Sequence, residues 1–304
     1  MTPTRQGSFR LFQIAGIEVF LHFSWFIVAY YGIKVRMPGY SSLVWPVAEY
    51  VALFATVLLH EFGHALACRS VGGKAEEIVL WPLGGVAYVA APPRPGAQLW
   101  SIAAGPLVNA VLLPFFWILS SATASAGWAD SNPNAQTFLV AMKYLNGGLL
   151  AFNLLPVYPL DGGQILRSLL WFGLGRAKSL KVASVVGFLG VAGLGCLALW
   201  STDVWLGLMT AFVGLNCWRG WKEAQLLSRI EQWPRRVGFK CPTCSKAPPV
   251  GPFWRCEACR APFDTFESFG GCPACGMAQT ATPCPDCGAI GPTANWVSAP
   301  PRQA

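Results

Sequence analysis

Charged side chains are scarce in this sequence. Asp, Glu, Lys and Arg make up 12% of its 304 residues, whereas 54% of the residues are hydrophobic. Soluble globular domains carry about twice that fraction of charge, so the composition excludes a soluble globular protein. The apolar residues fall in runs of about twenty, the length that crosses the hydrocarbon core of a bilayer. We therefore expect an α-helical polytopic membrane protein.

Histidine is scarcer still, with three in the chain, and two of them lie beside one glutamate. His60, Glu61 and His64 form the pattern His-Glu-x-x-His near the end of an apolar segment at about 47–71. On a helix, histidines four residues apart can bind one metal ion with the glutamate beside it. In a soluble helix these residues could form a solvated polar face. Inside an apolar helix ionisable groups are costly, which favours a zinc-binding cluster.

A catalytic zinc ion takes a third protein ligand and keeps one position for water. Polar side chains are few in the apolar segments, and Asp161 stands out at the cytoplasmic end of the fourth predicted helix, at the predicted depth of the two histidines. Pro156 and Pro159 break that helix, and the two glycines after Asp161 allow the backbone to turn. The sequence therefore predicts His60, His64 and Asp161 as ligands of one zinc ion.

The residue patterns predict about six membrane-crossing helices and one membrane-associated β-hairpin. The helices are expected at about 16–33, 47–71, 98–120, 137–157, 180–200 and 204–221. The first has no small-x-small cleavage site after it, so we expect a retained helix rather than a signal peptide. Residues 161–175 are too few to cross and are expected to lie along the interface. Residues 75–91, rich in β-branched and aromatic residues on either side of two glycines, predict the hairpin.

Basic residues set the predicted orientation. The net charge is +8, but the basic residues mostly flank apolar segments, where they orient a chain in the membrane, so nucleic acid is not the expected partner. The connections at 123–136 and 201–203 contain neither Lys nor Arg and are expected outside. Both termini and the zinc site then lie toward the cytoplasm of a bacterial or archaeal cell, although Lys34 and Arg36 oppose this orientation.

The eleven cysteines are unevenly distributed. Three are isolated in apolar segments, where a small residue packs. The other eight form four Cys-x-x-Cys pairs, the pattern of zinc ribbons in a reducing compartment: Cys241, Cys244, Cys256, Cys259, Cys272, Cys275, Cys284 and Cys287. We predict two closed four-thiolate zinc sites. The expected pairing is sequential, the first pair with the second and the third with the fourth, and a cross-braced pairing is the alternative.

Taken together, the two membrane motifs resemble a known family. His60-Glu61-x-x-His64 and Asn153-x-x-Pro156-x-x-x-Leu160-Asp161-Gly162 are similar to the motifs of the site-2 protease family of intramembrane zinc metalloproteases. Three other segments resemble that family in the expected order: His22-Phe-Ser24-Trp25, Leu83-Gly84-Gly85 and Ala104-Gly105-Pro106-x-x-Asn109. The similarity covers about residues 8–225, with neither a PDZ insertion nor a CBS pair.

The resemblance implies a role for each residue of the motifs. His60, His64 and Asp161 would bind the catalytic zinc ion, and Glu61 would be the general base. Asn153 would hydrogen-bond the substrate or the developing oxyanion, and a bond to a carbonyl of the broken helix is the open alternative.

Two other polar residues are expected to have structural roles. Asn109 is expected to pack or kink its helix near the site. His22 is expected to form a hydrogen bond among the helices rather than to bind metal.

The implied activity is hydrolysis of membrane-anchored proteins near the cytoplasmic face, as in regulated intramembrane proteolysis. The alternative is a catalytically silent membrane scaffold that recruits protein partners through its zinc ribbons. A metal transporter is disfavoured because no ionisable groups continue across the bilayer. The predicted order is a cytoplasmic segment, the protease domain, a linker, the double zinc ribbon and a flexible tail, at 1–15, 16–225, 226–239, 240–290 and 291–304.

Overall fold

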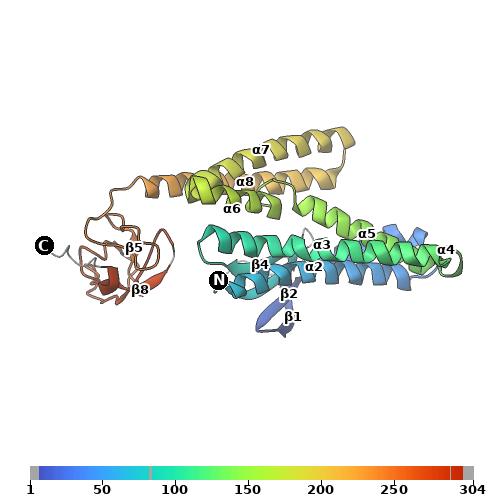
Figure 1. The fold of residues 1–304 in the computed structure, drawn as a ribbon, viewed down its shortest axis with the longest axis horizontal. Helices are drawn as coiled ribbons and strands as arrows, with labels where there is room; N and C mark the ends of the chain where they lie inside the picture. Colours follow the sequence, from blue (N-terminus) through green and yellow to red (C-terminus); the bar gives the residue numbers. More distant parts are fainter. Residues whose placement is uncertain (1–6, 82–83, 288, 297–304) are drawn as a thin grey trace. The chain divides into compact units, whose positions relative to one another are not determined.

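The computed structural model describes residues 7–81, 84–287 and 289–296. The chain divides into two compact units, one within Met1–Ala91 and Pro95–Lys222 and the other within Pro92–Arg94 and Glu223–Ala304. Figure 1 shows the helices and strands of both units.

The first unit is mainly helical. Its helices are α1 (Ser24–Arg36), α2 (Val44–Ser70), α3 (Pro95–Ser125), α4 (Trp128–Ser131), α5 (Pro133–Asn153), α6 (Asp161–Leu174), α7 (Arg176–Ser201) and α8 (Val204–Glu231), which continues into the second unit. A short 3-10 helix, Met37–Gly39, follows α1. Among the described helices, α2, α3 and α7 are long and apolar enough to cross a membrane. The six predicted crossings therefore remain a prediction, although α6 is the short helix that was expected.

The prediction of a helix over residues 16–33 is wrong in its first part. The chain instead forms a hairpin of β1 (Ser8–Ile14) and β2 (Ile17–His22), and helix α1 begins only at Ser24. Ala15 and Gly16 make the turn with φ of 51° and 71°. Four of the six residues of β2 are apolar and buried: Ile17, Val19, Phe20 and Leu21. An apolar run of this length suits a buried strand as well as a helix, so the pattern alone could not decide.

The hairpin predicted at 75–91 is confirmed as β3 (Lys74–Trp81) and β4 (Gly84–Ala90), with residues 82–83 outside the described part of the chain. The sheet has the order β1-β2-β3-β4, in which only the central pair is parallel. Strand β4 is therefore an edge strand. Ile17, Val19, Ile78 and Leu80 from the two central strands form a buried core with residues of α2.

Helix α3 connects the parts of this unit. It contacts α2, α5 and α6, and α6 in turn contacts α7. Figure 1 shows α2, α3 and α5 running alongside one another. Gly63 of α2 allows a close approach to α3, because a Cβ there would lie 2.7 Å from the carbonyl oxygen of Ala104. Small residues at such positions let membrane helices pack backbone to backbone.

The second unit has very short strands. Strand β5 (Trp254–Arg255) pairs with β6 (Pro262–Phe263), and β7 (Ala281–Pro283) pairs with β8 (Ile290–Pro292) before a last 3-10 turn, Thr293–Trp296. The predicted linker at 226–239 is helical as far as Glu231. The predicted flexible tail begins too early, because the Trp296 indole, 1% exposed, packs among the cysteines and aromatic rings of this unit.

Candidate metal centre

Helix α2 brings two imidazoles and a carboxylate into the interior of the first unit. His60, Glu61 and His64 are 7%, 6% and 8% exposed. The Nε2 atoms of the two histidines face each other at 3.1 Å. The spacing of four residues thus places both rings at one point, as the motif predicts.

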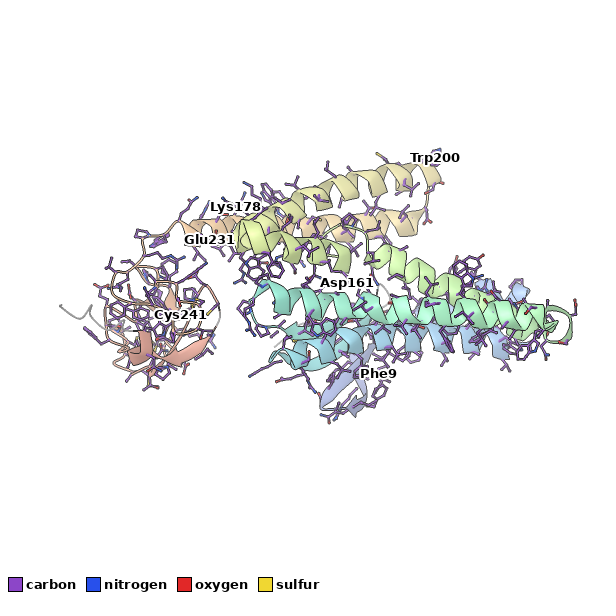
Figure 2. The ribbon with its side chains drawn as sticks, in the orientation of Figure 1. Phe9, Asp161, Lys178, Trp200, Glu231 and Cys241 are labelled. Carbon is purple, nitrogen blue, oxygen red and sulfur yellow. The ribbon has the colours of Figure 1, made fainter. Side chains whose placement is uncertain are left out.

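Asp161 reaches the same point from another helix. Its Oδ2 lies 3.1 Å from Nε2 of His60 and 3.5 Å from Nε2 of His64. Asp161 is the first residue of α6, marked in Figure 2, whereas the sequence placed it at the end of the preceding helix. Helix α5 ends earlier, at Asn153. We call His60, His64 and Asp161 the triad.

The two glycines after Asp161 allow a close approach rather than a turn. Both lie within α6. A Cβ on Gly162 would lie 2.3 Å from the carbonyl oxygen of Leu154, and a Cβ on Gly163 would lie 2.4 Å from the backbone nitrogen of Tyr158. The loop between α5 and α6 therefore packs directly on the start of α6, which fixes the position of Asp161.

Nε2 of each histidine faces the centre of the triad. The hydrogen bond of Nδ1, on the far side of each ring, determines which nitrogen carries the proton. Nδ1 of His64 lies 2.9 Å from the backbone carbonyl oxygen of Ser101, which can only accept, so this nitrogen donates. Nδ1 of His60 lies 2.6 Å from Oδ1 of Asn109. In neutral imidazoles with Nδ1 protonated, both Nε2 atoms present lone pairs.

With neutral rings, the triad therefore gathers three electron-pair donors, two Nε2 atoms and a carboxylate oxygen, an arrangement that a cation would stabilise. Zinc ligands about 2.0–2.1 Å from the ion at tetrahedral angles lie about 3.3 Å apart. The three separations in the triad, 3.1, 3.1 and 3.5 Å, fit that distance. The donor set and its spacing thus suit a zinc ion.

Helix α3 makes room for the triad and supplies its partners. A Cβ on Gly105 would lie 2.2 Å from Nε2 of His64 and 2.8 Å from Nε2 of His60. The sequence predicted Asn109 as a packing residue, but its 2.6 Å contact with His60 makes it a direct partner of the ring. A polar side chain in an apolar helix was the available signal. The Ser101 carbonyl carried no such signal, because every residue has one.

The side chain of Glu61 extends from α2 to the edge strand β4. Its Oε2 accepts a hydrogen bond of 2.8 Å from the backbone N–H of Ala87. A Cβ on Gly85 would lie 2.3 Å from Cγ of Glu61, so β4 needs glycine where it passes this side chain. The bond to Ala87 shows that this amide points away from β3, toward the open edge of the sheet.

The remaining predicted membrane residues are Asn153 and His22. Asn153 is half-buried at the end of α5, and among the described residues no hydrogen bond joins it to the triad. His22 pairs through Nδ1 with the Ser24 hydroxyl and stacks on Trp81 with ring centroids 4.6 Å apart. His22 therefore forms a hydrogen bond, as expected, but its ring lies at the sheet rather than among the helices.

In the second unit the cysteines form two clusters, and the predicted sequential pairing is wrong. The outer pairs, Cys241 and Cys244 with Cys284 and Cys287, form one cluster, and the inner pairs, Cys256, Cys259, Cys272 and Cys275, form the other. Eleven residues separate the first two pairs and twelve separate the middle two, so spacing could not discriminate between the pairings. The outer pairs meet because the ends of the unit meet, with the N–H of Lys240 donating to the carbonyl of Trp296 at 2.7 Å.

The sulfur positions suit zinc in both clusters. Contacts across the clusters are 3.7 and 3.8 Å in the outer one and 3.6 and 3.6 Å in the inner one. Thiolates about 2.3 Å from a tetrahedral zinc ion lie about 3.75 Å apart. The backbone N–H groups of Cys259 and then Ala258 face Cys256 and lower its pKa to about 7. Amides that point at sulfur favour the thiolate that metal binding requires.

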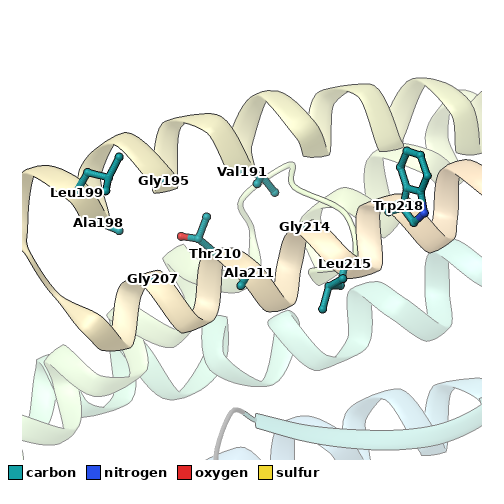
Figure 3. Close-up of a pocket in the computed structure, with 10 residues that line it drawn as sticks. All are labelled: Val191, Gly195, Ala198, Leu199, Gly207, Thr210, Ala211, Gly214, Leu215 and Trp218. Atoms are coloured by element: carbon teal, nitrogen blue, oxygen red, sulfur yellow. The ribbon is translucent and has the colours of Figure 1, made fainter.

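A separate apolar groove of about 630 Å³ lies between α7 and α8 (Figure 3). None of the triad residues lines it. Its walls are mainly small and aliphatic: Val191, Gly195, Ala198, Leu199, Gly207, Thr210, Ala211, Gly214, Leu215 and Trp218. The groove therefore offers packing surface rather than reactive groups.

Two family profiles match the chain. The Peptidase M50B-like profile matches residues 39–142, which include the histidine pair, and the Peptidase family M50 profile matches residues 123–197, which include Asp161. A solved structure, the site-2 protease from Methanocaldococcus jannaschii, is 31% identical with a TM-score of 0.51 and covers 70% of this chain and 95% of that one.

Two curated relatives are similar over different lengths. The zinc metalloprotease MJ0392 of Methanocaldococcus jannaschii is 37% identical over 182 residues, 59% of this chain and 50% of that protein. Rip3 of Mycobacterium tuberculosis is 27% identical over 262 residues, 80% of this chain and 64% of Rip3. The chain thus spans about half the length of the first relative and less than two thirds of the second.

Proposed function

Because this chain belongs to the site-2 protease family of zinc metalloproteases, we propose that it hydrolyses peptide bonds of membrane-anchored proteins. The observation that carries the proposal is the convergence of the two Nε2 atoms and Oδ2 of Asp161 at zinc-ligand spacing. A scaffold without catalysis has no need of a buried ionisable cluster of this kind.

His60, His64 and Asp161 would hold the zinc ion, which supplies Lewis acidity that polarises a carbonyl and makes water a nucleophile near neutral pH. Glu61 would take the proton of the attacking water and pass it to the leaving amine. Its carboxylate, 6% exposed, adjoins His60 in the chain, and its only described hydrogen bond is to Ala87. Asn153 would hydrogen-bond the substrate or the developing oxyanion.

The edge strand β4 offers a way to bind the substrate. A helix hides its peptide groups in its own hydrogen bonds, so the substrate must unwind into an extended strand before cleavage. An edge strand can pair with such a segment by β-augmentation. Because the N–H of Ala87 bonds Glu61, a strand paired at the open edge of β4 would lie beside the proposed general base.

Val89→Pro tests this mode of binding. Backbone groups two residues apart on a strand point to the same side, so we expect the Val89 N–H to share the open edge with that of Ala87, beside the register shift of β3 between Ala75 and Glu77. Proline removes this donor, and we expect cleavage of a membrane-anchored reporter to be lost while the triad keeps its zinc. Normal cleavage by the variant would exclude pairing at this edge.

Glu61→Gln tests the activity itself. The amide keeps the shape of the side chain but cannot take a proton, so reporter cleavage should vanish with zinc retained. Glu49→Gln is a matched control, because Glu49 is also a buried glutamate of α2 but bonds Arg36 and Tyr40 instead. Unchanged cleavage by Glu61→Gln would support the scaffold alternative, in which the zinc ribbons recruit protein partners.

We propose a multi-pass orientation in the cell membrane with both termini cytoplasmic and cleavage near the inner face. The clustering of basic residues on alternate connections supports it. Single cysteines placed at 201–203 in a background without Cys196 should react with an impermeant thiol reagent added outside. Protection of these cysteines would reverse the orientation.

A further inference from the structure

Two asparagines form a chain of hydrogen bonds that begins at His60 of the triad. Asn109 on α3 and Asn146 on α5 are both 0% exposed. Nδ2 of Asn109 donates to Oδ1 of Asn146 at 3.2 Å, and Nδ2 of Asn146 donates to the carbonyl oxygen of Met142 at 3.0 Å. With the 2.6 Å contact between His60 and Asn109, hydrogen bonds connect the His60 ring to a backbone carbonyl of α5.

The Met142 carbonyl fixes the direction of these hydrogen bonds. A carbonyl oxygen only accepts, so Asn146 must turn its NH2 group toward Met142 and its oxygen toward Asn109. Asn109 must then turn its NH2 group toward Asn146 and its oxygen toward His60. Nδ1 of His60 therefore donates, and in the neutral ring its Nε2 carries the lone pair.

We propose that Asn146 is a positioning residue, which acts through Asn109 to hold His60 in the tautomer that can bind zinc through Nε2. The inference rests on the proposed function, because it takes His60 as a zinc ligand. His64 needs no such support, since its Nδ1 bonds a backbone carbonyl that has no alternative orientation. A side-chain amide can rotate and present either its oxygen or its NH2 group, and Asn146 removes that freedom from Asn109.

Asn146→Leu tests this role with a side chain of similar size. The variant removes the oxygen that receives the NH2 group of Asn109. Asn109 can then present this group to His60, which favours the tautomer protonated on Nε2. We expect zinc to bind the triad about 10- to 100-fold more weakly, the range found when an outer-shell partner of a metal ligand is lost.

The measurement is the zinc Kd of the full chain, by competition with a chelator. A His60→Ala/His64→Ala variant gives the zinc held by the cysteine clusters alone, which is then subtracted. This readout does not depend on cleavage, so it separates metal binding from catalysis.

Asn109→Asp supplies a rescue that a packing defect could not produce. A carboxylate has no NH2 group to present, so it accepts from Nδ1 of His60 whether or not residue 146 holds it in place. Zinc affinity should therefore return close to that of the wild type in the double variant Asn146→Leu/Asn109→Asp.

Asn216→Leu is the matched control. Nδ2 of Asn216 donates to the carbonyl of Phe212 at 2.8 Å, the same four-residue contact that Asn146 makes, but its described hydrogen bonds do not reach the triad. Its zinc Kd should equal that of the wild type. Unchanged affinity in Asn146→Leu, or a loss that Asn109→Asp does not restore, would overturn the inference alone. Wild-type protein with no zinc beyond the cysteine clusters would overturn the proposed function as well.

Discussion

The triad and the cysteine clusters would surround a zinc ion with opposite electrostatic environments. Two neutral imidazoles and one carboxylate leave the ion a net positive charge and a free fourth position. Four thiolates close the tetrahedron and make the site net negative. The first arrangement keeps the Lewis acidity that hydrolysis requires, whereas the second gives it up. The donor sets therefore separate a reactive centre from structural ones within a single chain.

The secondary structure around the two kinds of site also differs, with long helices around the triad and very short strands around the cysteines. The triad is held by α2, α3 and α6, which have 27, 31 and 14 residues, and α3 packs directly against both α2 and α6. The cysteines lie beside strands of two or three residues. Apart from the cysteines, the core of the second unit is formed by a few side chains such as Trp254, Phe266 and Trp296. The second unit should therefore need zinc in order to fold. The first unit should fold without zinc and need the ion only to complete its metal site.

Removal of zinc should reveal the largest difference between the two units. Structural zinc contributes about 10–16 kcal/mol in small metal-dependent domains, more than the few aromatic contacts of the second unit can replace. After chelation we expect amide hydrogen exchange at 240–296 to reach unfolded rates, while the amides of α2 and α3 stay protected. The full chain is used, so both units are compared in one sample.

Cys256→Ser is the matched genetic version of that experiment. It should release the inner cluster without touching the triad, and reporter cleavage should continue if the ribbons have no role in catalysis. Protection of residues 240–296 in the chelated protein would show that the aromatic core folds without metal and would remove the contrast between the two scaffolds.

Gly105→Ala should have the next largest effect, confined to the triad. The added Cβ would lie 2.2 Å from Nε2 of His64, at the position where a metal ligand must be free. We expect zinc affinity at the triad to fall by more than about 100-fold, the upper end of what loss of an outer-shell partner costs. Zinc in the cysteine clusters and the helical circular dichroism should not change.

Gly148→Ala is the control for a methyl group added to a glycine in a helix of the first unit. No atom lies within 4 Å of the position of its Cβ, so zinc affinity should be that of the wild type. Full zinc content in Gly105→Ala would mean that the close packing of α3 on the histidines is not required for the metal centre.

The sequence predicted those parts of the molecule that depend on local pattern. Apolar runs located α2, α3 and the helices from α5 to α8, and the scarcity of polar groups in those runs singled out Asp161. The strand at Ile17–His22 was missed, because a short apolar run suits a buried strand and a helix equally.

Features that depend on tertiary packing could not be predicted in this way. The partner of Asn109 is an asparagine 37 residues away on α5, and the partner of His64 is a backbone carbonyl, which no residue type marks. The pairing of the cysteine pairs follows from how the ends of the second unit meet. In each case the deciding contact lies between segments distant in sequence.

The smallest expected effect concerns the charge beside the outer cysteine cluster. Asp286 lies between Cys284 and Cys287, and its side chain is 7% exposed. Arg235 binds it with two hydrogen bonds, of 2.6 and 3.2 Å, whereas Lys246 approaches at 3.5 Å and is 58% exposed. A net negative thiolate site with a further carboxylate beside it needs a nearby cation.

Arg235→Lys should therefore lower the stability of the zinc-loaded second unit by about 1 kcal/mol, because lysine keeps the charge but cannot make both bonds. Lys246→Gln should change it little, since the exposed pair is screened by water. Hydrogen exchange of the second unit at constant zinc measures both variants. Equal effects would mean that net charge alone matters beside the thiolates, whereas a larger effect at Arg235 shows that the geometry of the carboxylate pair supports the cluster. The outer cluster would then depend on a positioned side chain just as the triad depends on Asn109.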